Sequence, residues 1–267
     1  MGSFNVNFNG VNIPSWIKVK AVDFTALAEP TINLTKRTGG IGSIYSGFSL
    51  GSKKISLKIL IPPQYKTSFI TGKTTSETPV LTTVARELSE WLMGDNWKPS
   101  PLYFGNDEGI YYDAIVSNSV DISDLLVAGE GTIEFVVPSG VSRGAIHGNI
   151  ATIDWTNKVA TIDYQGTAPS YAYVEYKPHT IINPEDDWYM EVQENLTELY
   201  IDYFNSFSEN VIDCEARSIK STSTTSLNNL RFNKFTWLQF PKRGIYHIDL
   251  NIPEHCDLSI KCTEYFY

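Results

Sequence analysis

Hydrophobic and polar residues alternate along most of this chain with a period of two, the pattern that predicts β-strands. The opening SFNVNF alternates in this way and is followed by Asn9 and Gly10, a pair that favours a tight hairpin turn. KKISLKILI stops at Pro62 and Pro63, and GTIEFVVP stops at Pro138, since proline cannot donate a hydrogen bond within a central strand. We therefore predict a mainly β protein.

One segment departs from this pattern and predicts an amphipathic helix. Thr78 is a suitable N-cap with Pro79 at the first helical position, Gly94 is placed to end the helix, and Pro99 and Pro101 prevent its resumption. The residues at helical spacing on one face are Val80, Leu81, Val84, Leu88, Trp91 and Leu92. We expect this helix to cover one face or an open edge of a sheet.

A glycine-rich, basic arm is the natural interpretation of TKRTGGIGSIYSGFSLGSKK, residues 35–54, which holds five glycines and four basic residues. The GGIGS stretch does not have the lysine spacing of a phosphate-binding loop, and no helix is predicted after it. The arm is therefore expected to be a flexible hairpin or loop.

The best domain boundary is the Pro-Ser-Gly turn at 138–140, which divides the chain into residues 1–138 and 139–267. Beyond it, the sequence ATID occurs at 151–154 and again at 160–163 around a polar turn, which predicts a short hairpin. The remainder consists of short alternating strands with turn signals, the pattern of a β-sandwich or jelly roll.

Composition narrows the class of protein. The 267 residues are 42% hydrophobic and include 13 Phe, 15 Tyr and 6 Trp, which describes an ordered globular protein. The net charge of -9 is uneven: residues 1–138 hold 11 basic and 13 acidic residues, a charge of -2, and residues 139–267 hold 10 and 17, a charge of -7. The acidic second half disfavours nucleic acid or an anionic membrane surface as its main partner.

We expect no signal peptide and no membrane span, because the chain has no basic start followed by an apolar run and no window of about 18 apolar residues. The three cysteines, at positions 214, 256 and 262, are then expected to be free thiols of a protein made in a reducing cytoplasm.

Metal and cofactor chemistry is not predicted. His247, His255, Cys256 and Cys262 have the residue types of a zinc site, but their spacing does not match a zinc knuckle. His255 and Cys256 are adjacent, and adjacent side chains on a strand point to opposite faces. The chain also lacks GxSxG and HExxH motifs, so the sequence identifies no catalytic nucleophile.

The segment PEDDWYM leaves three interpretations open. Trp188 or Tyr189 with Asp187 would suit contact with a sugar ring, and Glu185 with Asp187 would be the only candidates for a cell-wall hydrolase. The interpretation we favour is a polar turn leading into a strand whose aromatic side chains enter the core.

The order of features resembles a known family. The opening FNG turn, the basic arm, a strand ending in Pro-Pro, a helix reading ARELSEWL, then KPSPLYF, YYDA, GTIEFVVP and a β-rich second domain are similar to the distal tail proteins of long, non-contractile-tailed bacteriophages. The similarity covers residues 4–140 well and extends more loosely to the second half.

This resemblance implies a β-sandwich-like first domain with one helix and an arm, followed by a galectin-like or jelly-roll sandwich. It implies a non-enzymatic virion protein that forms a hexameric ring, single or in stacked rings, through residues 1–138, with 139–267 as a peripheral domain. The partners would be the tail tube protein, the tail-associated lysin or tip protein, and a receptor-binding protein or host saccharide, with no membrane. The candidate interface residues are Arg37, Gly39, Gly40, Tyr45, Phe48 and Trp91.

Overall fold

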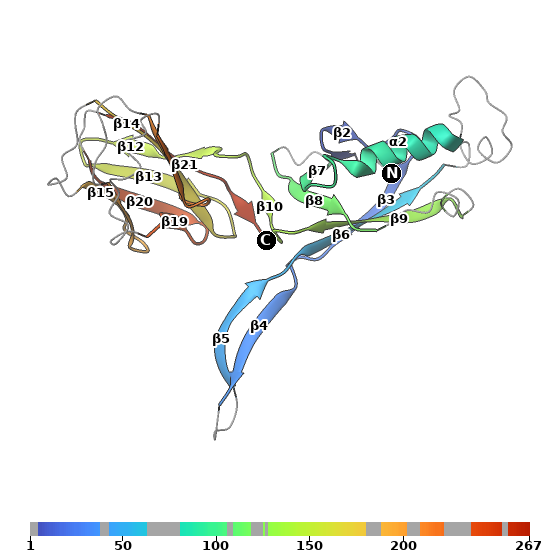
Figure 1. Cartoon of the computed structure of the whole chain (residues 1–267), viewed down its shortest axis with the longest axis horizontal. Helices are drawn as coiled ribbons and strands as arrows, with labels where there is room; N and C mark the ends of the chain where they lie inside the picture. Colours follow the sequence, from blue (N-terminus) through green and yellow to red (C-terminus); the bar gives the residue numbers. More distant parts are fainter. Residues whose placement is uncertain are drawn as a thin grey trace. The chain divides into compact units, whose positions relative to one another are not determined.

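A computed structural model describes residues 5–37, 43–62, 81–105, 109–118, 125, 128–179, 188–201, 209–221, 236–252 and 256–267. The chain divides into two compact units (Figure 1). The first unit contains residues 1–142 together with Tyr267, and the second contains residues 143–266.

The first unit is built on one seven-stranded antiparallel sheet. Its strands are β1 (Val6–Phe8), β2 (Val11–Asn12), β3 (Lys18–Phe24), β6 (Lys53–Leu60), β7 (Ser100–Phe104), β8 (Tyr112–Val116) and β9 (Glu130–Val137), in the order β2-β1-β7-β8-β9-β6-β3. The predicted first hairpin is confirmed: Asn9 and Gly10 have φ angles of 52° and 78°, as the turn between β1 and β2 requires. The strands β6 and β9 end before Pro62 and Pro138, as predicted.

The predicted helix is present as α2 (Leu81–Met93), and Leu88 and Trp91 of its apolar face enter the core of this unit. The ring of Trp91 lies 6.0 Å from Phe8 of β1 and 6.2 Å from Phe135 of β9. Phe8 and Phe135 lie 5.2 Å apart, although a flat sheet would separate their strands by about 14 Å. The sheet therefore curls around the core, which makes the unit sandwich-like. Thr78, Pro79 and Val80 lie outside the described residues.

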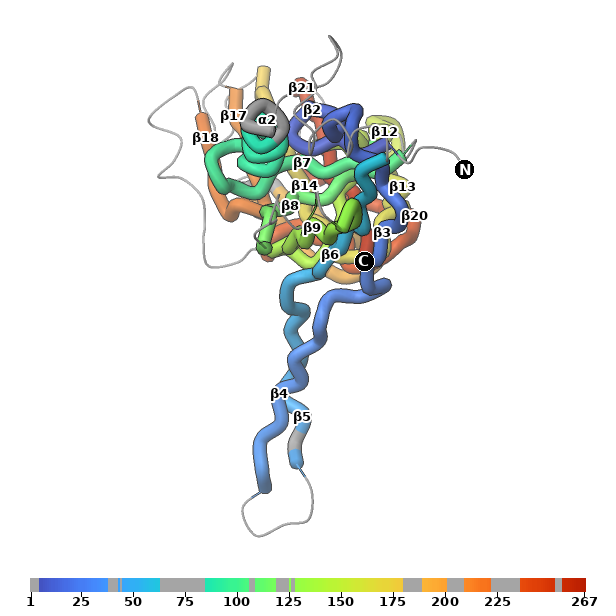
Figure 2. Tube along the Cα trace, turned by 90° about the vertical axis from the view of Figure 1, so that its right-hand side faces the viewer, coloured from blue at the N-terminus to red at the C-terminus, as the bar shows by residue number. Residues whose placement is uncertain are grey.

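The predicted arm is a long hairpin formed by β4 (Pro30–Lys36) and β5 (Ser43–Leu50). In the described part of the chain these strands pair only with each other, and a hydrogen bond from the Gly51 amide to the Glu29 carbonyl, 2.8 Å long, closes the base. Figures 1 and 2 show the arm leaving the first unit on the side away from α2.

The second unit is a sandwich of two antiparallel sheets. One has the order β11-β21-β14-β17-β18, with β19 also paired to β14, and the other has the order β12-β13-β20-β15-β16. The strands that follow β9 are β10 (Ser142–Arg143), β11 (Asn149–Ile150), β12 (Thr152–Asp154), β13 (Val159–Tyr164), β14 (Ser170–Pro178), β15 (Trp188–Val192), β16 (Thr197–Ile201), β17 (Asn210–Asp213), β18 (Ser218–Ser221), β19 (Gln239–Phe240), β20 (Gly244–Asn251), β21 (Cys256–Cys262) and β22 (Tyr265–Phe266).

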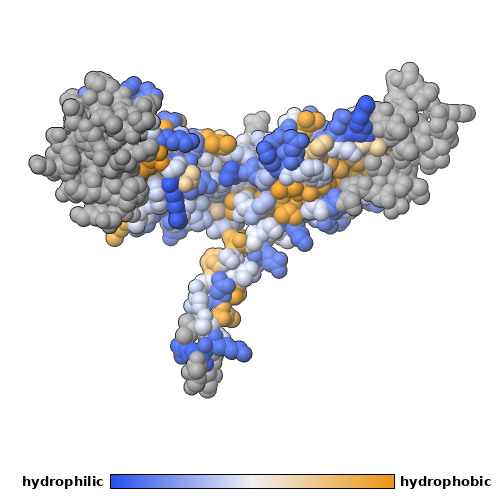
Figure 3. All heavy atoms as spheres, viewed as in Figure 1, coloured by the Kyte–Doolittle hydropathy of each residue, from blue (hydrophilic) through white to orange (hydrophobic). Residues whose placement is uncertain are grey.

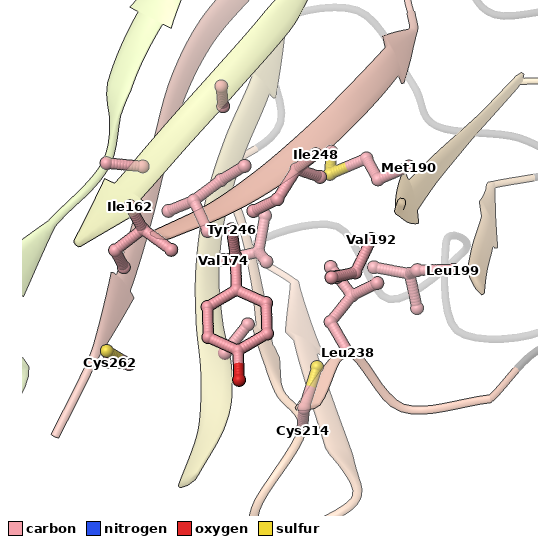
Figure 4. Close-up of a cluster of buried hydrophobic side chains, with 14 of the residues drawn as sticks. Ile162, Val174, Met190, Val192, Leu199, Cys214, Leu238, Tyr246, Ile248 and Cys262 are labelled. Atoms are coloured by element: carbon pink, nitrogen blue, oxygen red, sulfur yellow. The ribbon is translucent and has the colours of Figure 1, made fainter. Parts of the chain in front are cut away.

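Inward-facing residues of both sheets form one core between them, which Figure 4 shows in close-up. Ile162 and Ile248 come from one sheet and Val174 and Cys262 from the other. The repeated ATID segments form the predicted hairpin, in which Ile153 of β12 lies opposite Ala160 of β13. The mainly β fold with one described helix is therefore confirmed. Among the described residues, no helix is long and apolar enough to cross a membrane.

Candidate assembly surface

The arm carries apolar side chains on a face that no other described part of the chain covers. Three cross-strand pairs lie on this face: Pro30 with Leu50, Ile32 with Phe48, and Leu34 with Tyr45. The side chains of Ile32, Leu34, Tyr45 and Phe48 are each about 60% exposed. An isolated two-stranded hairpin is marginally stable in water, and exposed apolar side chains in a row mark an interaction surface.

A β-bulge makes this apolar face continuous. Tyr45 and Phe48 are three residues apart, so that a regular strand would put them on opposite faces. The register shifts by one residue at this point: Gly47 lies opposite Asn33, Tyr45 lies opposite Leu34, and Ser46 is the extra residue. Tyr45 and Phe48 therefore share a face.

The opposite face of the arm is mostly polar, although Ile44 lies opposite Thr35 there, so the hairpin is amphipathic. It carries the hydroxyls of Thr31, Thr35 and Ser49, and the Thr35 and Ser46 hydroxyls form a hydrogen bond of 2.9 Å. At the end of β4, Lys36 and Arg37 are exposed and make the described end of the arm basic. Gly39 and Gly40, the other predicted interface residues of the arm, lie outside the described residues.

A groove of about 400 Å³ lies beside α2 in the same unit. Its apolar wall comes from Phe8, Val11, Pro14 and Trp91, and its acidic rim comes from Glu87 and Glu90. Val11 is 57% exposed, whereas Trp91 is only 4% exposed. Trp91 donates a hydrogen bond of 3.0 Å from its indole N–H to the Val11 carbonyl. Trp91, predicted as an interface residue, lines this groove but is almost completely buried, so only a small part of its side chain is accessible to a partner.

The structure adds exposed apolar residues that the sequence analysis did not identify. Trp97 is 62% exposed in the turn after α2, at a φ of 65°, and its amide donates to the Met93 carbonyl over 3.2 Å. Ile32 and Leu34 are equally exposed on the arm. Their alternation with polar residues is visible in the sequence, but an alternating strand normally buries its apolar face.

Apolar side chains recur along the arm in Figure 3. The arm has no second layer of its own, so this surface differs from the apolar faces of the neighbouring sheet, whose residues lie in the core. The arm is therefore the strongest candidate functional surface in the described part of the first unit.

In the second unit, Tyr189 lies beside Tyr200 on the outward face of the five-stranded sheet. Their rings are 5.5 Å apart and tilted by 37°, on the paired strands β15 and β16. Burial and the neighbouring Glu198 carboxylate raise the pKa of Tyr200. Asp187 lies outside the described residues, and Trp188 is described only as the first residue of β15.

The next row of this face is acidic: Glu191 of β15 lies between Glu198 of β16 and Asp249 of β20. Like charges directly opposite each other on a sheet are unfavourable. The side-chain amide of Gln193 donates to Asp249 over 2.7 Å. Aromatic rings beside carboxylates are the groups that stack on a sugar and accept hydrogen bonds from its hydroxyls.

Of the residues considered for zinc, those that the structure describes do not form a metal centre. His247 bonds through Nδ1 to the Glu194 carboxylate at 2.7 Å, and all three cysteines are free thiols. Among the described residues, no group of three or more His, Cys, Asp or Glu side chains is arranged to hold a metal ion. His255 and Glu185 lie outside the described residues.

The curled sheet with its helix and arm, followed by a two-sheet sandwich, defines a two-unit β fold that is shared with a solved phage protein. One solved structure with this fold is the Dit protein (gp 19.1) of phage SPP1, described as a paradigm of the hub adsorption apparatus in phages that infect Gram-positive bacteria. The two chains are 13% identical and align over 100% of each with a TM-score of 0.71. The predicted resemblance to distal tail proteins is thus confirmed in the fold.

Two structures of the phage P2 baseplate in its activated conformation, with Ca and with Sr, align less well. Their TM-scores are 0.44 and 0.42 at 8% and 7% identity, over 98% of this chain and 97% of theirs. No family model matches the sequence, and no curated protein sequence is similar to it.

Proposed function

We propose that this protein is a structural hub of a phage tail. Its first unit forms a hexameric ring at the distal end of the tail, and the ring links the tail tube to the tail-associated lysin and to tip, baseplate or receptor-binding proteins. The protein is made in the host cytoplasm, acts in the virion and has no catalytic role.

The observation that carries this proposal is the amphipathic arm. It presents exposed apolar side chains on both strands without a core beneath them. Exposed apolar side chains in a row, on a hairpin of marginal stability, favour a surface that another chain covers. The fold shared with the Dit hub protein of phage SPP1 favours a copy of this chain as that partner.

The first experiment is the mass of the purified protein by light scattering at several concentrations, with negative-stain imaging of large species. We expect a species near six times 30.0 kDa, about 180 kDa, that appears as a ring with a central hole. A strict monomer at every concentration would contradict self-assembly.

A variant for comparison with the wild-type protein lacks the arm but keeps Pro30 and Leu50 at the base of the arm. Pro30 and Leu50 are cross-strand partners, so an Asn-Gly turn can join them in place of residues 31–49. We expect this variant to remain folded and monomeric. An armless protein that still forms normal rings would refute the role of the arm.

A second candidate function is binding of a host cell-surface saccharide by the second unit. The pair of Tyr189 and Tyr200 beside Glu191 and Glu198 favours it. A glycan array with the whole protein tests this function: we expect binding that is lost in a Tyr189→Ala, Tyr200→Ala variant. Absence of binding to any host glycan would exclude saccharide binding. A separate cell-wall degradation assay tests whether the protein is a hydrolase, and we expect it to be negative.

A further inference from the structure

The base of the arm is packed more closely than a flexible hairpin requires. Two short segments of the first unit lead into the arm: residues 25–29, which follow β3, and residues 51–52, which precede β6. We propose that this base is a rigid joint, in which Lys53 and Gly140 fix the direction of the arm before any partner binds. The inference goes beyond the proposed function, since it concerns how the free protein holds the arm.

Lys53 is a buried charge at this joint. It is the first residue of β6 and is only 2% exposed, whereas Lys54 beside it is exposed on the opposite face of the strand. The next residues on the face of Lys53, Ile55 and Leu57, lie in the core. A lysine is rarely buried unless it is paired, yet Lys53 forms no ion pair with another described residue.

The ammonium group of Lys53 joins the two segments at the base. Its Nζ atom donates a hydrogen bond of 3.4 Å to the carbonyl of Ala26, which lies between β3 and the arm. It also lies 5.9 Å from the ring centroid of Phe24, at the end of β3, and 5.5 Å from that of Tyr112, in β8. A cation is attracted to an aromatic ring at such distances, and more strongly where water is excluded. One side chain therefore ties residues 24–26 to β6 and β8.

This arrangement is explained better by position than by stability. Burial lowers the pKa of Lys53, because desolvation disfavours the charged ammonium group. Replacing buried charged groups with apolar side chains of similar volume is often neutral or stabilising. A methionine at this position would avoid the desolvation cost, but it could not donate to the Ala26 carbonyl. What the lysine adds is a defined position for the segment that leads into the arm.

The turn after β9 packs against the same base. Gly140 has a φ of +72°, and a Cβ added there would lie 2.6 Å from the Gly51 carbonyl oxygen and 2.9 Å from the Ala28 Cβ. Ala28 is buried, and the Gly51 amide is already bonded to the Glu29 carbonyl. Neither neighbouring atom is the end of a flexible side chain, so any larger residue at position 140 must displace the base of the arm.

The two contacts together leave the arm little freedom at its base, where β5 runs into β6 in Figures 1 and 2. The glycine-rich sequence predicted a flexible hairpin, and these contacts argue for a fixed one. An arm that already points in its bound direction loses less conformational entropy when a partner covers it. The joint therefore preorganises the arm.

Hydrogen exchange of the whole protein tests the joint. The reporter is the Gly51 amide, whose hydrogen bond to the Glu29 carbonyl must break when the base opens. We expect Lys53→Met to speed exchange at this amide about tenfold without lowering the temperature of thermal unfolding. The matched control is Lys54→Met, which removes the same charge from the exposed face of β6 and should leave the exchange unchanged.

Gly140→Ala tests the other side of the joint. We expect it to displace Gly51 and to speed exchange at the same amide about tenfold or more. Its control is Gly10→Ala, which has a similar φ of +78° but nothing within 4 Å of the added Cβ, and should leave this exchange unchanged. All proteins are compared at a concentration where light scattering gives them the same mass.

The outcomes separate the joint from the ring. Unchanged exchange at Gly51 in either Lys53→Met or Gly140→Ala overturns the joint. A Lys53→Met protein that unfolds at a clearly lower temperature also overturns it, because Lys53 would then serve the stability of the core and not the position of the arm. A wild-type protein that never forms rings contradicts the proposed function and leaves this result standing.

Discussion

Single residues fix several features of this chain through packing that is specific to one site. Gly94 ends α2 with a φ of +56°, and a Cβ added there would lie 2.9 Å from a Phe8 ring carbon and 3.0 Å from the Ser100 hydroxyl. Gly105 has a similar φ of +60°, but nothing lies within 4 Å of its added Cβ. The two glycines share a backbone requirement and differ only in the space around them.

We predict that Gly94→Ala destabilises the first unit by about 2–4 kcal/mol, since it adds an overpacking cost to the cost of a left-handed backbone. Gly105→Ala is the matched control and should cost about 1–2 kcal/mol, the backbone contribution alone. Urea unfolding followed by tryptophan fluorescence measures both. Equal losses in the two variants would show that the Phe8 contact does not matter.

The buried thiols of the second unit give its stability a pH dependence. Burial raises the pKa of Cys214 and of Cys262 to about 12, from an ordinary value of 9.0. Since the folded state binds these protons more tightly than the unfolded state, their contribution is complete below about pH 9 and is lost as the pH rises toward 12.

We predict that the second unit loses stability above about pH 9, by roughly 1.4 kcal/mol per pH unit for each of these thiols. The double variant Cys214→Ala, Cys262→Ala should be less stable at pH 7 because it leaves cavities, but its stability should decline less steeply above pH 9. Unfolding midpoints between pH 7 and 11 measure this, and parallel pH profiles for the two proteins would contradict it.

At the scale of elements, the arm depends on one bulge. Gly47 has a φ of 124°, which other residues rarely adopt, and Ser46 beside it is the extra residue of β5. This local irregularity decides which face Tyr45 occupies, and with it the continuity of the apolar face.

We predict that Gly47→Val removes the bulge, turns Tyr45 to the polar face and weakens assembly about tenfold or more, while both units stay folded. Deleting Ser46 in the same variant should restore assembly, because a regular ladder then keeps Tyr45 opposite Leu34. Mass by light scattering reports the result. If the deletion fails to restore what Gly47→Val removes, the register of Tyr45 is not the cause.

At the scale of the whole molecule, the described residues form two hydrophobic cores, one in each unit. One combines α2 with the curled sheet, and the other lies between the two sheets of the sandwich. No described residue belongs to both cores, so we expect a substitution in one core to change the packing of that core alone.

We predict two calorimetric transitions that respond to different substitutions. Gly94→Ala should lower only the transition of the first unit, and Cys262→Ala only that of the second, by about 4 °C for each kcal/mol. A single transition that moves with both substitutions would show that the units unfold together.

The sequence by itself determined the local elements of this protein. Asn9 and Gly10 predicted the first turn, Pro62 and Pro138 predicted strand ends, and helical spacing predicted α2, because the residues that decide each of these features are close together in the chain. The order of these elements was sufficient to indicate the fold.

Only the tertiary structure decided which of the apolar residues face solvent. Trp91 and Phe48 are both apolar residues in amphipathic elements, but α2 packs on a sheet and the arm does not. The groove joins Val11 to Trp91, 80 residues away, and the outward aromatic pair joins Tyr189 to Tyr200 across two strands. Burial and long-range neighbours depend on how distant segments pack, and local sequence pattern does not contain that information.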